Sequence, residues 1–247
     1  MMISKTKPRK LFTKKDLALE SPEQKKKRAA EILKRLSRRF AGARIALKYS
    51  SPVQLMAAVI LSAQCTDKKV NEVTATLFKK YKTARDFAKA DLATFESEVR
   101  PTGFYRAKAR NIIAASKFLE SKFGSRLPKT MEEMTMLPGV ARKSANIILG
   151  NAHGVVEGIA VDTHVMRISQ RLGLTEFSDP VKIERDLMGL FPKNRWFDLT
   201  YKIIEHGRNI CDAKKPKCSM CPLNDICPSA FNLPNWQCPV KIFEENL

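Results

Sequence analysis

Apolar residues recur every three or four positions along most of the chain, which is the period of an amphipathic helix. Segment 55–61 differs, because it is apolar on all sides yet too short to span a bilayer, and it predicts a central core helix. No segment alternates convincingly between apolar and polar residues. We therefore expect an all-α protein of roughly ten helices with short connections. The expected helices lie at about 22–40, 52–61, 67–80, 83–90, 91–99, 112–123, 131–136, 141–149, 163–172, 180–191 and 196–210.

Segment 136–149 holds two helical patterns that meet at a Pro-Gly turn. Thr130 followed by Glu133 has the form of a capping box that begins the first helix, and Gly150 is placed to end the second. A turn that leads into a helix points backbone N–H groups outward at the positive end of the helix dipole, which predicts a phosphate site that does not read bases. Lys143 stands on the first turn of the second helix. Its amine could serve as a counter-ion or as a nucleophile, and this segment alone leaves both open.

The net charge of +20 indicates a polyanionic partner, of which nucleic acid is the first candidate. Residues 1–44 hold 15 Lys and Arg against 4 Asp and Glu. Residues 1–27 are basic, polar and aperiodic, so we expect a flexible tail there, with a non-specific nucleic-acid contact or a sorting signal as alternatives. An anionic membrane is a weaker alternative, because no long helix has a clean basic face opposite an aromatic and leucine face.

No run reaches about 18 consecutive apolar residues, so we expect no membrane-spanning helix. The first ten residues lack the apolar stretch of a signal peptide. A cytoplasmic protein is the resulting expectation, associated with the nucleoid if the source is bacterial. In a reducing compartment, we expect the six cysteines to be metal ligands or spare thiols in preference to disulfides.

Four cysteines follow one another with intervals of six, two and five residues: Cys211, Cys218, Cys221 and Cys227. Four thiolates in one short, proline-containing segment can surround a zinc ion or an iron–sulfur cluster. Zinc sites usually pair two short Cys-x-x-Cys knuckles, and only one is present here, so the wider spacing favours the larger cluster. Zinc and unligated thiols remain alternatives. Cys65 and Cys238 fall outside the spacing and are expected to be small hydrophobic residues.

Three lysines lie between the first two of these cysteines, at Lys214, Lys215 and Lys217. They predict a basic loop, shaped by the metal centre, that touches DNA phosphates. A solvated run of charges is the alternative.

Taken together, the motifs resemble those of the endonuclease III family of DNA glycosylases and abasic-site (AP) lyases. The resemblance rests on segment 61–67 (LSAQCTD), segment 137–143 (LPGVARK), segment 161–165 (VDTHV) and the cysteine spacing, in that order, and covers about residues 30–230. It implies a two-lobed helix-hairpin-helix fold: a six-helix barrel at 45–155, and a domain of residues 28–44 and 156–247 that holds a 4Fe–4S cluster. DNA would cross the cleft between the lobes with the damaged nucleotide flipped out of the stack.

The resemblance also implies residue roles. Lys143 matches the nucleophile that forms an imine with the sugar, and the helix N-terminus, Arg142 and partial burial are expected to favour its neutral, reactive form. Asp162 matches the catalytic aspartate, although the sequence supports a plain helix N-cap equally well. Gln64 matches a residue that fills the gap left by the flipped nucleotide, and Phe104 matches an apolar wedge, with core packing as the alternative. The expected DNA contacts are Gln64, Phe104, Gly139, Ala141, Arg142, His164, Lys214, Lys215 and Lys217.

Two positions depart from the family pattern. Ala141 stands where the family usually has glycine, so the hairpin needs an ordinary backbone conformation at this position or accepts strain. Thr102 replaces an apolar residue common beside the wedge, which leaves Phe104 to intercalate alone.

The implied function is a bifunctional glycosylase and AP lyase that acts, as a monomer, on double-stranded DNA with oxidised pyrimidines or abasic sites. A monofunctional adenine glycosylase of the same superfamily would lack Lys143 and carry a further C-terminal domain. A non-catalytic DNA-binding protein is the third reading, and the pairing of Lys143 with Asp162 argues against it.

Overall fold

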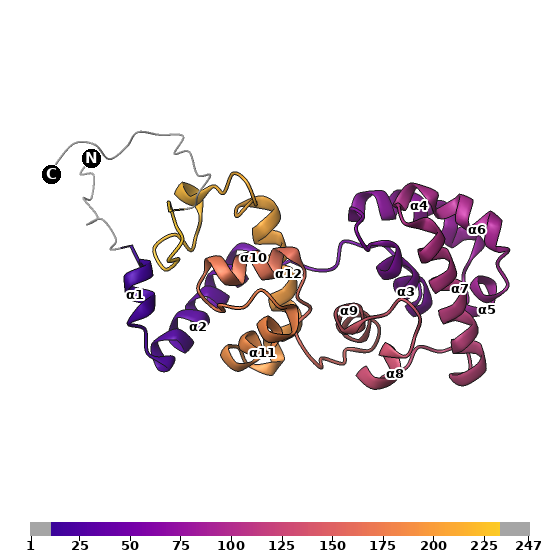
Figure 1. Cartoon of the computed structure of the whole chain (residues 1–247), viewed down its shortest axis with the longest axis horizontal. Helices are drawn as coiled ribbons and strands as arrows, with labels where there is room; N and C mark the ends of the chain where they lie inside the picture. Colours follow the sequence, from indigo (N-terminus) through magenta and orange to yellow (C-terminus); the bar gives the residue numbers. More distant parts are fainter. Residues whose placement is uncertain (1–10, 233–247) are drawn as a thin grey trace. The chain divides into compact units, whose positions relative to one another are not determined.

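The computed structural model describes residues 11–232, and the regular secondary structure within this range is all helical, without a strand (Figure 1). The prediction of an all-α fold is therefore confirmed. Among these helices, none has the length and apolarity that crossing a bilayer requires. The α-helices are α1 (Lys14–Ala18), α2 (Pro22–Arg39), α3 (Pro52–Leu61), α4 (Asp67–Lys80), α5 (Ala84–Ala88), α6 (Leu92–Val99), α7 (Tyr105–Lys122), α8 (Met131–Thr135), α9 (Arg142–His153), α10 (Thr163–Arg171), α11 (Pro180–Leu190) and α12 (Trp196–Asn209). Three 3₁₀ turns are η1 (Arg100–Thr102), η2 (Lys193–Arg195) and η3 (Cys218–Met220).

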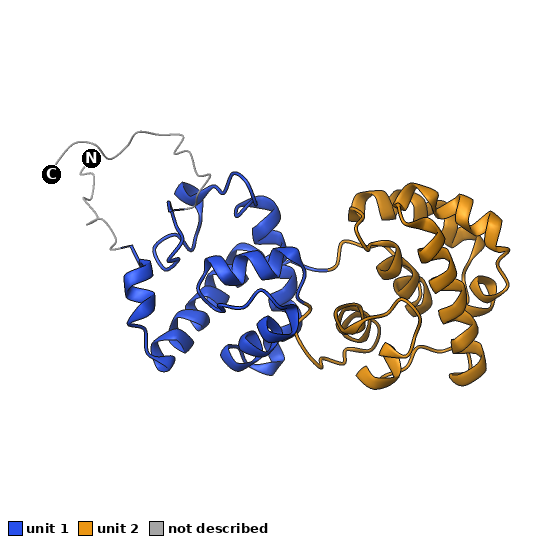
Figure 2. Cartoon of the chain, in the orientation of Figure 1, with its two compact units in different colours: residues 1–44, 161–247 blue, residues 45–160 orange. Residues whose placement is uncertain are grey.

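The chain divides into two compact units (Figure 2). Unit 1 comprises residues 1–44 and 161–247, and unit 2 comprises residues 45–160. Each unit has its own core.

Unit 2 is built around α3, as the apolar run predicted. Every residue of α3 from Val53 to Leu61 is buried, and the helix packs against α4, α7 and α9. The long helix α7 packs against α5 and α6 on another side. There Tyr81, Phe87 and Phe95 form an aromatic cluster with ring centroids 5.1–6.0 Å apart. α8 packs on α9 and completes the unit.

In unit 1, helices from the two ends of the chain share one core. α2 buries Ala29, Ile32, Leu33 and Leu36, and packs against α11 and α12. α10 lies against α12 and α11. The apolar face of segment 22–40, visible in the sequence, is thus the N-terminal contribution to this core.

Most helix boundaries follow from capping residues. Thr83, Asp91, Asp162 and Asp179 each accept a hydrogen bond at the side chain from the backbone N–H three residues on. The expected end of the hairpin's second helix at Gly150 is wrong, because α9 continues to His153. Gly150 is buried inside the helix, and Gly154 adopts the left-handed conformation that ends it (φ 66°).

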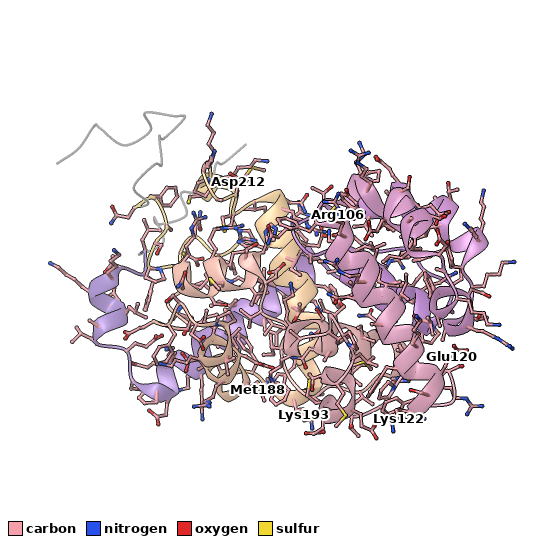
Figure 3. The ribbon with its side chains drawn as sticks, turned by 45° about the vertical axis from the view of Figure 1, so that its right-hand side comes forward. Arg106, Glu120, Lys122, Met188, Lys193 and Asp212 are labelled. Carbon is pink, nitrogen blue, oxygen red and sulfur yellow. The ribbon has the colours of Figure 1, made fainter. Side chains whose placement is uncertain are left out.

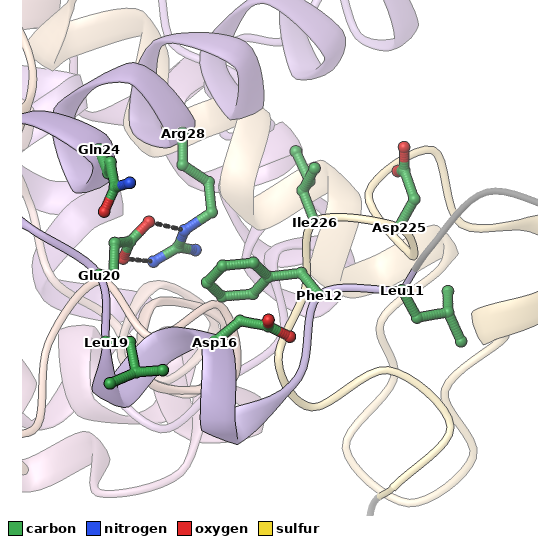
Figure 4. A pocket seen from close by; sticks show the side chains of 9 residues that line it. All are labelled: Leu11, Phe12, Asp16, Leu19, Glu20, Gln24, Arg28, Asp225 and Ile226. Carbon is green, nitrogen blue, oxygen red and sulfur yellow. Dashed lines mark hydrogen bonds and ion pairs between the residues drawn. The ribbon is translucent and has the colours of Figure 1, made fainter.

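The expectation of a flexible tail over residues 1–27 is wrong for its described part. α1 forms at Lys14–Ala18, and Ser21 caps α2. The Arg28 guanidinium pairs with the Glu20 carboxylate at 2.7 Å and lies 4.7 Å from the centre of the Phe12 ring (Figure 4). Glu20 falls in the expected tail, but the fold pairs it with Arg28 and buries both side chains. Residues 1–10 lie outside the described range.

We expect Glu20→Gln to destabilise the protein by about 3 kcal/mol, because the Arg28 charge would remain buried after its partner is neutralised. The side chains of Arg28 and Glu20 are only 6% and 4% exposed. Glu72→Gln is the matched control, because Glu72 pairs with Lys69 while both side chains are 47% exposed. The free energy of unfolding in urea checks this, and equal losses in the two variants would contradict it.

Candidate DNA-binding and catalytic site

The hairpin between α8 and α9 is a tight turn held by backbone hydrogen bonds. The N–H of Leu137 donates to the Met134 carbonyl (3.3 Å), and the N–H of Val140 donates to the Leu137 carbonyl (3.0 Å). Leu137 and Val140 are buried and anchor the turn in the core of unit 2. The polar backbone between them is thereby left at the surface. Thr130 caps α8 as predicted, by accepting the N–H of Glu133.

Gly139 is required in this turn for two reasons. Its φ is +80°, in the left-handed region that side chains disfavour. In addition, a Cβ at this position would lie 2.9 Å from Cβ of Asn111, a residue of α7. The hairpin therefore sits directly against α7.

Ala141 resolves the first departure from the family pattern. It is the N-cap of α9 with φ −85° and ψ 170°, an ordinary extended conformation without strain. Alanine therefore fits where the family usually has glycine. Ala141 has no side chain that could cap the helix, so the start of α9 remains suited to an external anion.

Lys143 lies on the first turn of α9 and is exposed, so the expectation of partial burial is wrong. The core-facing residues of α9 include Ala145, Ile148 and Leu149. Lys143 precedes Ala145 by two positions, which places it on nearly the opposite side of the helix. Its amine is consequently accessible to a bound molecule, next to the exposed Arg142.

Gln64 and Phe104 share an unusual backbone. Both are exposed, and both have the left-handed φ that non-glycine residues rarely adopt, 51° and 48° respectively. Gln64 lies in the loop between α3 and α4, and Phe104 precedes α7 with its side chain 66% exposed. Core packing of Phe104 is thereby ruled out. Strained backbone that displays a side chain to solvent is characteristic of functional sites.

Basic and aromatic side chains surround Phe104. The guanidinium groups of Arg100 and Arg106 lie 5.9 and 5.2 Å from the centre of the Tyr105 ring. Figure 3 marks Arg106 at this end of α7, whereas Glu120 and Lys122 lie at the other. Thr102, the second departure from the family pattern, is buried and donates its hydroxyl to the Val99 carbonyl (2.8 Å). It is a structural residue of η1, and Phe104 is the exposed apolar group of this loop.

In unit 1, Asp162 caps α10, as one of the two readings of the sequence predicted. One carboxylate oxygen, Oδ1, accepts the N–H of Val165 at 2.8 Å. His164 follows on the first turn, and its Nδ1 lies 3.2 Å from the Arg167 guanidinium. Burial lowers the pKa of His164, although the Asp162 charge opposes this, so the neutral ring accepts a hydrogen bond from Arg167.

Sequence reasoning missed Gly207 and Arg167, which lie beside His164, and Arg171, which contacts the cysteine segment. A Cβ on Gly207 would lie 2.6 Å from His164 Nδ1, so only glycine fits there. Arg167 also donates to the Cys211 carbonyl (3.1 Å). Arg171, one turn further on α10, donates to Cys211 Sγ (3.3 Å) and to the carbonyl groups of Asp212 (2.7 Å) and Ala213 (2.8 Å). Arg167 and Arg171 are four residues apart on α10, the helix that Asp162 caps. This i, i+4 spacing was the signal in the sequence that both guanidinium groups lie on one face of the helix.

Cys211, Cys218, Cys221 and Cys227 line one small cavity, whose other walls include Ile168, Leu172 and Leu223. Among the described residues, no three Cys, His, Asp or Glu groups lie close enough together to hold a single metal ion. Four thiols around one common cavity are the donor set that an iron–sulfur cluster uses.

The electrostatics of this cavity also suit a cationic centre. Burial raises the pKa of the Cys221 thiol to about 12 and that of Cys227 to about 11. Thiolates therefore need compensating positive charge, which the irons of a cluster supply. His206 lies beside Cys221, and burial lowers its pKa to about 4, so it is neutral there.

The basic loop between Cys211 and Cys218 is ordered by its own backbone. Asp212 Oδ1 accepts the N–H groups of Lys214 (2.8 Å) and Lys215 (3.0 Å), and both lysines are exposed. Lys217 is exposed as well, although its Nζ donates to the Asn209 carbonyl at 3.2 Å. The loop thus presents at least two lysines to solvent.

The expected site residues fall into two groups. Unit 2 carries Gln64, Phe104, Gly139, Ala141, Arg142 and Lys143, and unit 1 carries Asp162, His164, the four cysteines and the three lysines. Within unit 2, Phe104 directly precedes α7, and Gly139 of the hairpin lies against Asn111 of the same helix. The sequence order alone did not indicate that common support.

Comparisons with known proteins agree with this arrangement. Residues 57–193 match the HhH-GPD superfamily of base excision DNA repair proteins, and residues 211–227 match the iron–sulfur binding domain of endonuclease III. Endonuclease III of Synechocystis sp. is 50% identical over 206 residues, which cover 83% of this chain and 94% of the relative.

Two solved structures are similar in fold and sequence. One is a non-covalent endonuclease III–DNA complex, and the other is a trapped covalent endonuclease III–DNA intermediate. Each is 40% identical to this chain with a TM-score of 0.80, and the match covers 83% of this chain and 96% of the other.

We expect Gly139→Ala to weaken binding to duplex DNA that contains a tetrahydrofuran abasic analogue, because both φ strain and the clash with Asn111 would displace the hairpin. Gly154→Ala is the matched control: its φ is +66°, but nothing lies within 4 Å of an added Cβ. Both variants should lose about 1–2 kcal/mol of stability from φ alone. Fluorescence anisotropy measures the affinity of each variant for DNA. Equal affinities would show that the Asn111 contact has no role in DNA binding by the hairpin.

We expect the purified protein to be brown, with broad visible absorption, and Cys221→Ala to lose that absorption together with iron. Cys65→Ala is the control, because Cys65 belongs to unit 2 and is not one of the residues that line the cysteine cavity. Metal analysis and the visible spectrum check this. A colourless protein with stoichiometric zinc would contradict the assignment.

Proposed function

Because this chain belongs to the endonuclease III family, within the HhH-GPD superfamily of base excision DNA repair proteins, we propose that Lys143 is its catalytic nucleophile. The activity itself is that of the family: a DNA N-glycosylase that removes oxidised pyrimidines and an AP lyase that cuts abasic sites. The chain binds an iron–sulfur cluster and DNA.

The observation that carries the assignment is an exposed amine on the first turn of α9, beside a helix N-terminus suited to phosphate. Lys143 Nζ attacks the anomeric carbon of the sugar as the bond to the damaged base breaks, and the base leaves with the bonding electrons. The lysine nitrogen then loses its proton, the bond between the anomeric carbon and the ring oxygen breaks, and the sugar opens to an imine with the ring oxygen leaving as a hydroxyl. This imine acidifies the neighbouring sugar carbon. Loss of that proton then breaks the bond to the 3′ phosphate oxygen, which is β-elimination.

A covalent lysine intermediate of this kind can be reduced and trapped on DNA. The trapped endonuclease III–DNA intermediate among the similar structures is of the type that such chemistry gives. It supports the proposal for this chain, which is 40% identical to that protein.

We propose that Asp162 stabilises positive charge on the sugar or accepts the lysine proton. Its capping bond uses one oxygen, Oδ1, and so is compatible with this role. Lys143 belongs to unit 2 and Asp162 to unit 1. His164, held neutral and oriented by Arg167, is assigned to the surroundings of the same nucleotide.

The DNA contacts follow from exposure and chemistry. The backbone from Gly139 to Arg142 holds a phosphate, Phe104 wedges into the stack, and Gln64 fills the gap left by the flipped nucleotide. Lys214, Lys215 and Lys217 add phosphate contacts from the basic loop, which would make binding salt-dependent.

Cys211, Cys218, Cys221 and Cys227 are the proposed ligands of the cluster. Its principal role is to fix the basic loop, and Arg167 and Arg171 connect that loop to α10. The proposed domains are a six-helix barrel in unit 2 and a cluster domain in unit 1. Because the substrate is chromosomal DNA, we place a monomeric enzyme in the cytoplasm, at the nucleoid of a bacterial cell.

We expect Lys143→Ala to abolish covalent trapping by borohydride on duplex DNA with an abasic site, because no other amine occupies this position. Lys89→Ala is the matched control, since Lys89 is an exposed lysine of the same unit at the end of α5. Gel separation of the trapped complex measures the result. Trapping that survives Lys143→Ala would refute the assignment of the nucleophile. The family activity is tested separately, by single-turnover excision of thymine glycol with the wild-type protein.

A further inference from the structure

Lys108 is a buried lysine whose contacts the proposed function does not use. It lies on the second turn of α7 with 4% of its surface exposed. Its ammonium group donates to two backbone carbonyls, that of Leu61 at 2.8 Å and that of Thr102 at 2.7 Å. Leu61 is the last residue of α3, so its carbonyl lies at the negative end of a helix dipole.

The two carbonyls belong to the two strained loops of unit 2. Leu61 precedes Gln64 by three residues, and Thr102 precedes Phe104 by two. Both Gln64 and Phe104 adopt left-handed backbone conformations that persist only where their surroundings fix them. One side chain thus joins the bases of the two loops that display these residues.

Burial of an ammonium group is costly, and burial does lower the pKa of Lys108. An apolar residue of similar length would fill the same volume without that cost, but it would leave two buried carbonyl acceptors without their donor. A lysine at position 108 is therefore explained by the two backbone carbonyls that it bonds and holds in place. Charge-assisted hydrogen bonds of this length are strong enough to fix a loop.

We propose that Lys108 is a positioning residue that holds the Gln64 and Phe104 loops in register with each other, so that both side chains enter the duplex as one unit. The inference rests on the roles assigned above to Gln64 and Phe104. Asn111, three residues further on α7, lies against Gly139 of the hairpin. The first two turns of α7 therefore support all three elements of unit 2 that are assigned to DNA.

The test compares Lys108→Met with the wild-type holoenzyme on duplex DNA that carries 2-aminopurine next to thymine glycol. Stopped-flow fluorescence follows unstacking before excision, and single-turnover cleavage follows the chemistry. We expect both rates to fall by about tenfold or more. A decrease of this size corresponds to the free energy of about one hydrogen bond to a charged group. Borohydride trapping on a preformed abasic site should change far less, because there is no base to unstack.

Lys202→Met is the matched control. Lys202 is also a buried lysine, 6% exposed and paired with Asp198, but it lies on α12 of unit 1. We expect it to lower the thermal unfolding midpoint and to leave the fluorescence rise unchanged. Should Lys108→Met fail to fold, Lys108→Gln retains an N–H donor and is expected to give a smaller decrease in the same direction.

Phe104→Ala and Gln64→Ala separate the inference from the function on which it rests. If these two variants slow the fluorescence rise and a folded Lys108→Met does not, Lys108 is a structural residue only and the inference is overturned. If neither of the two slows the rise, the roles of the loops themselves are wrong, and the inference falls with them. A slow rise in all three variants, with Lys202→Met unaffected, supports it.

Discussion

Two hydrogen bonds inside unit 2 constrain the loops that carry its proposed DNA contacts. Lys108 donates both, to the end of α3 and to η1, from a position where water cannot replace them. Because the same helix also abuts Gly139, displacement of α7 would disturb the hairpin as well as both loops. Flipping a nucleotide requires several groups to act at fixed separations, and a single rigid helix is a direct way to keep them fixed.

Unit 1 uses guanidinium groups for a comparable purpose. Arg167 and Arg171 project from α10 to the segment that begins at Cys211, and α10 itself begins at the cap Asp162. Order in the cysteine segment is thereby coupled to the position of the proposed catalytic aspartate. A cluster held by the four proposed cysteine ligands would perform no step of the reaction and would still be needed for activity, because it would fix the segment to which Arg167 and Arg171 of α10 are bonded.

Local signals in the sequence were sufficient for most of the fold. Caps and glycines gave the starts and ends of most helices, and the apolar run 55–61 gave the central helix of unit 2. Failures occurred where burial decided the outcome. Gly150 was taken as a stop but lies inside α9, and Glu20 was taken as part of a mobile tail but pairs with Arg28 in a buried contact. The residues close to Gly150 and Glu20 in the sequence do not reveal that Gly150 is buried or that Glu20 has Arg28 as its partner.

By itself the sequence determined the helical class, the family resemblance, the residues proposed for chemistry and the preference for a cluster, because motif spacing and residue type carry that information. Only the tertiary structure decided how those residues are presented. It showed that the backbone of Ala141 is unstrained and that Lys143 and Phe104 are exposed to solvent. It also joined Lys108 to carbonyl groups 47 and 6 residues away in the chain. Backbone acceptors have no signature in a sequence, so contacts made to them appear only when the helices have packed.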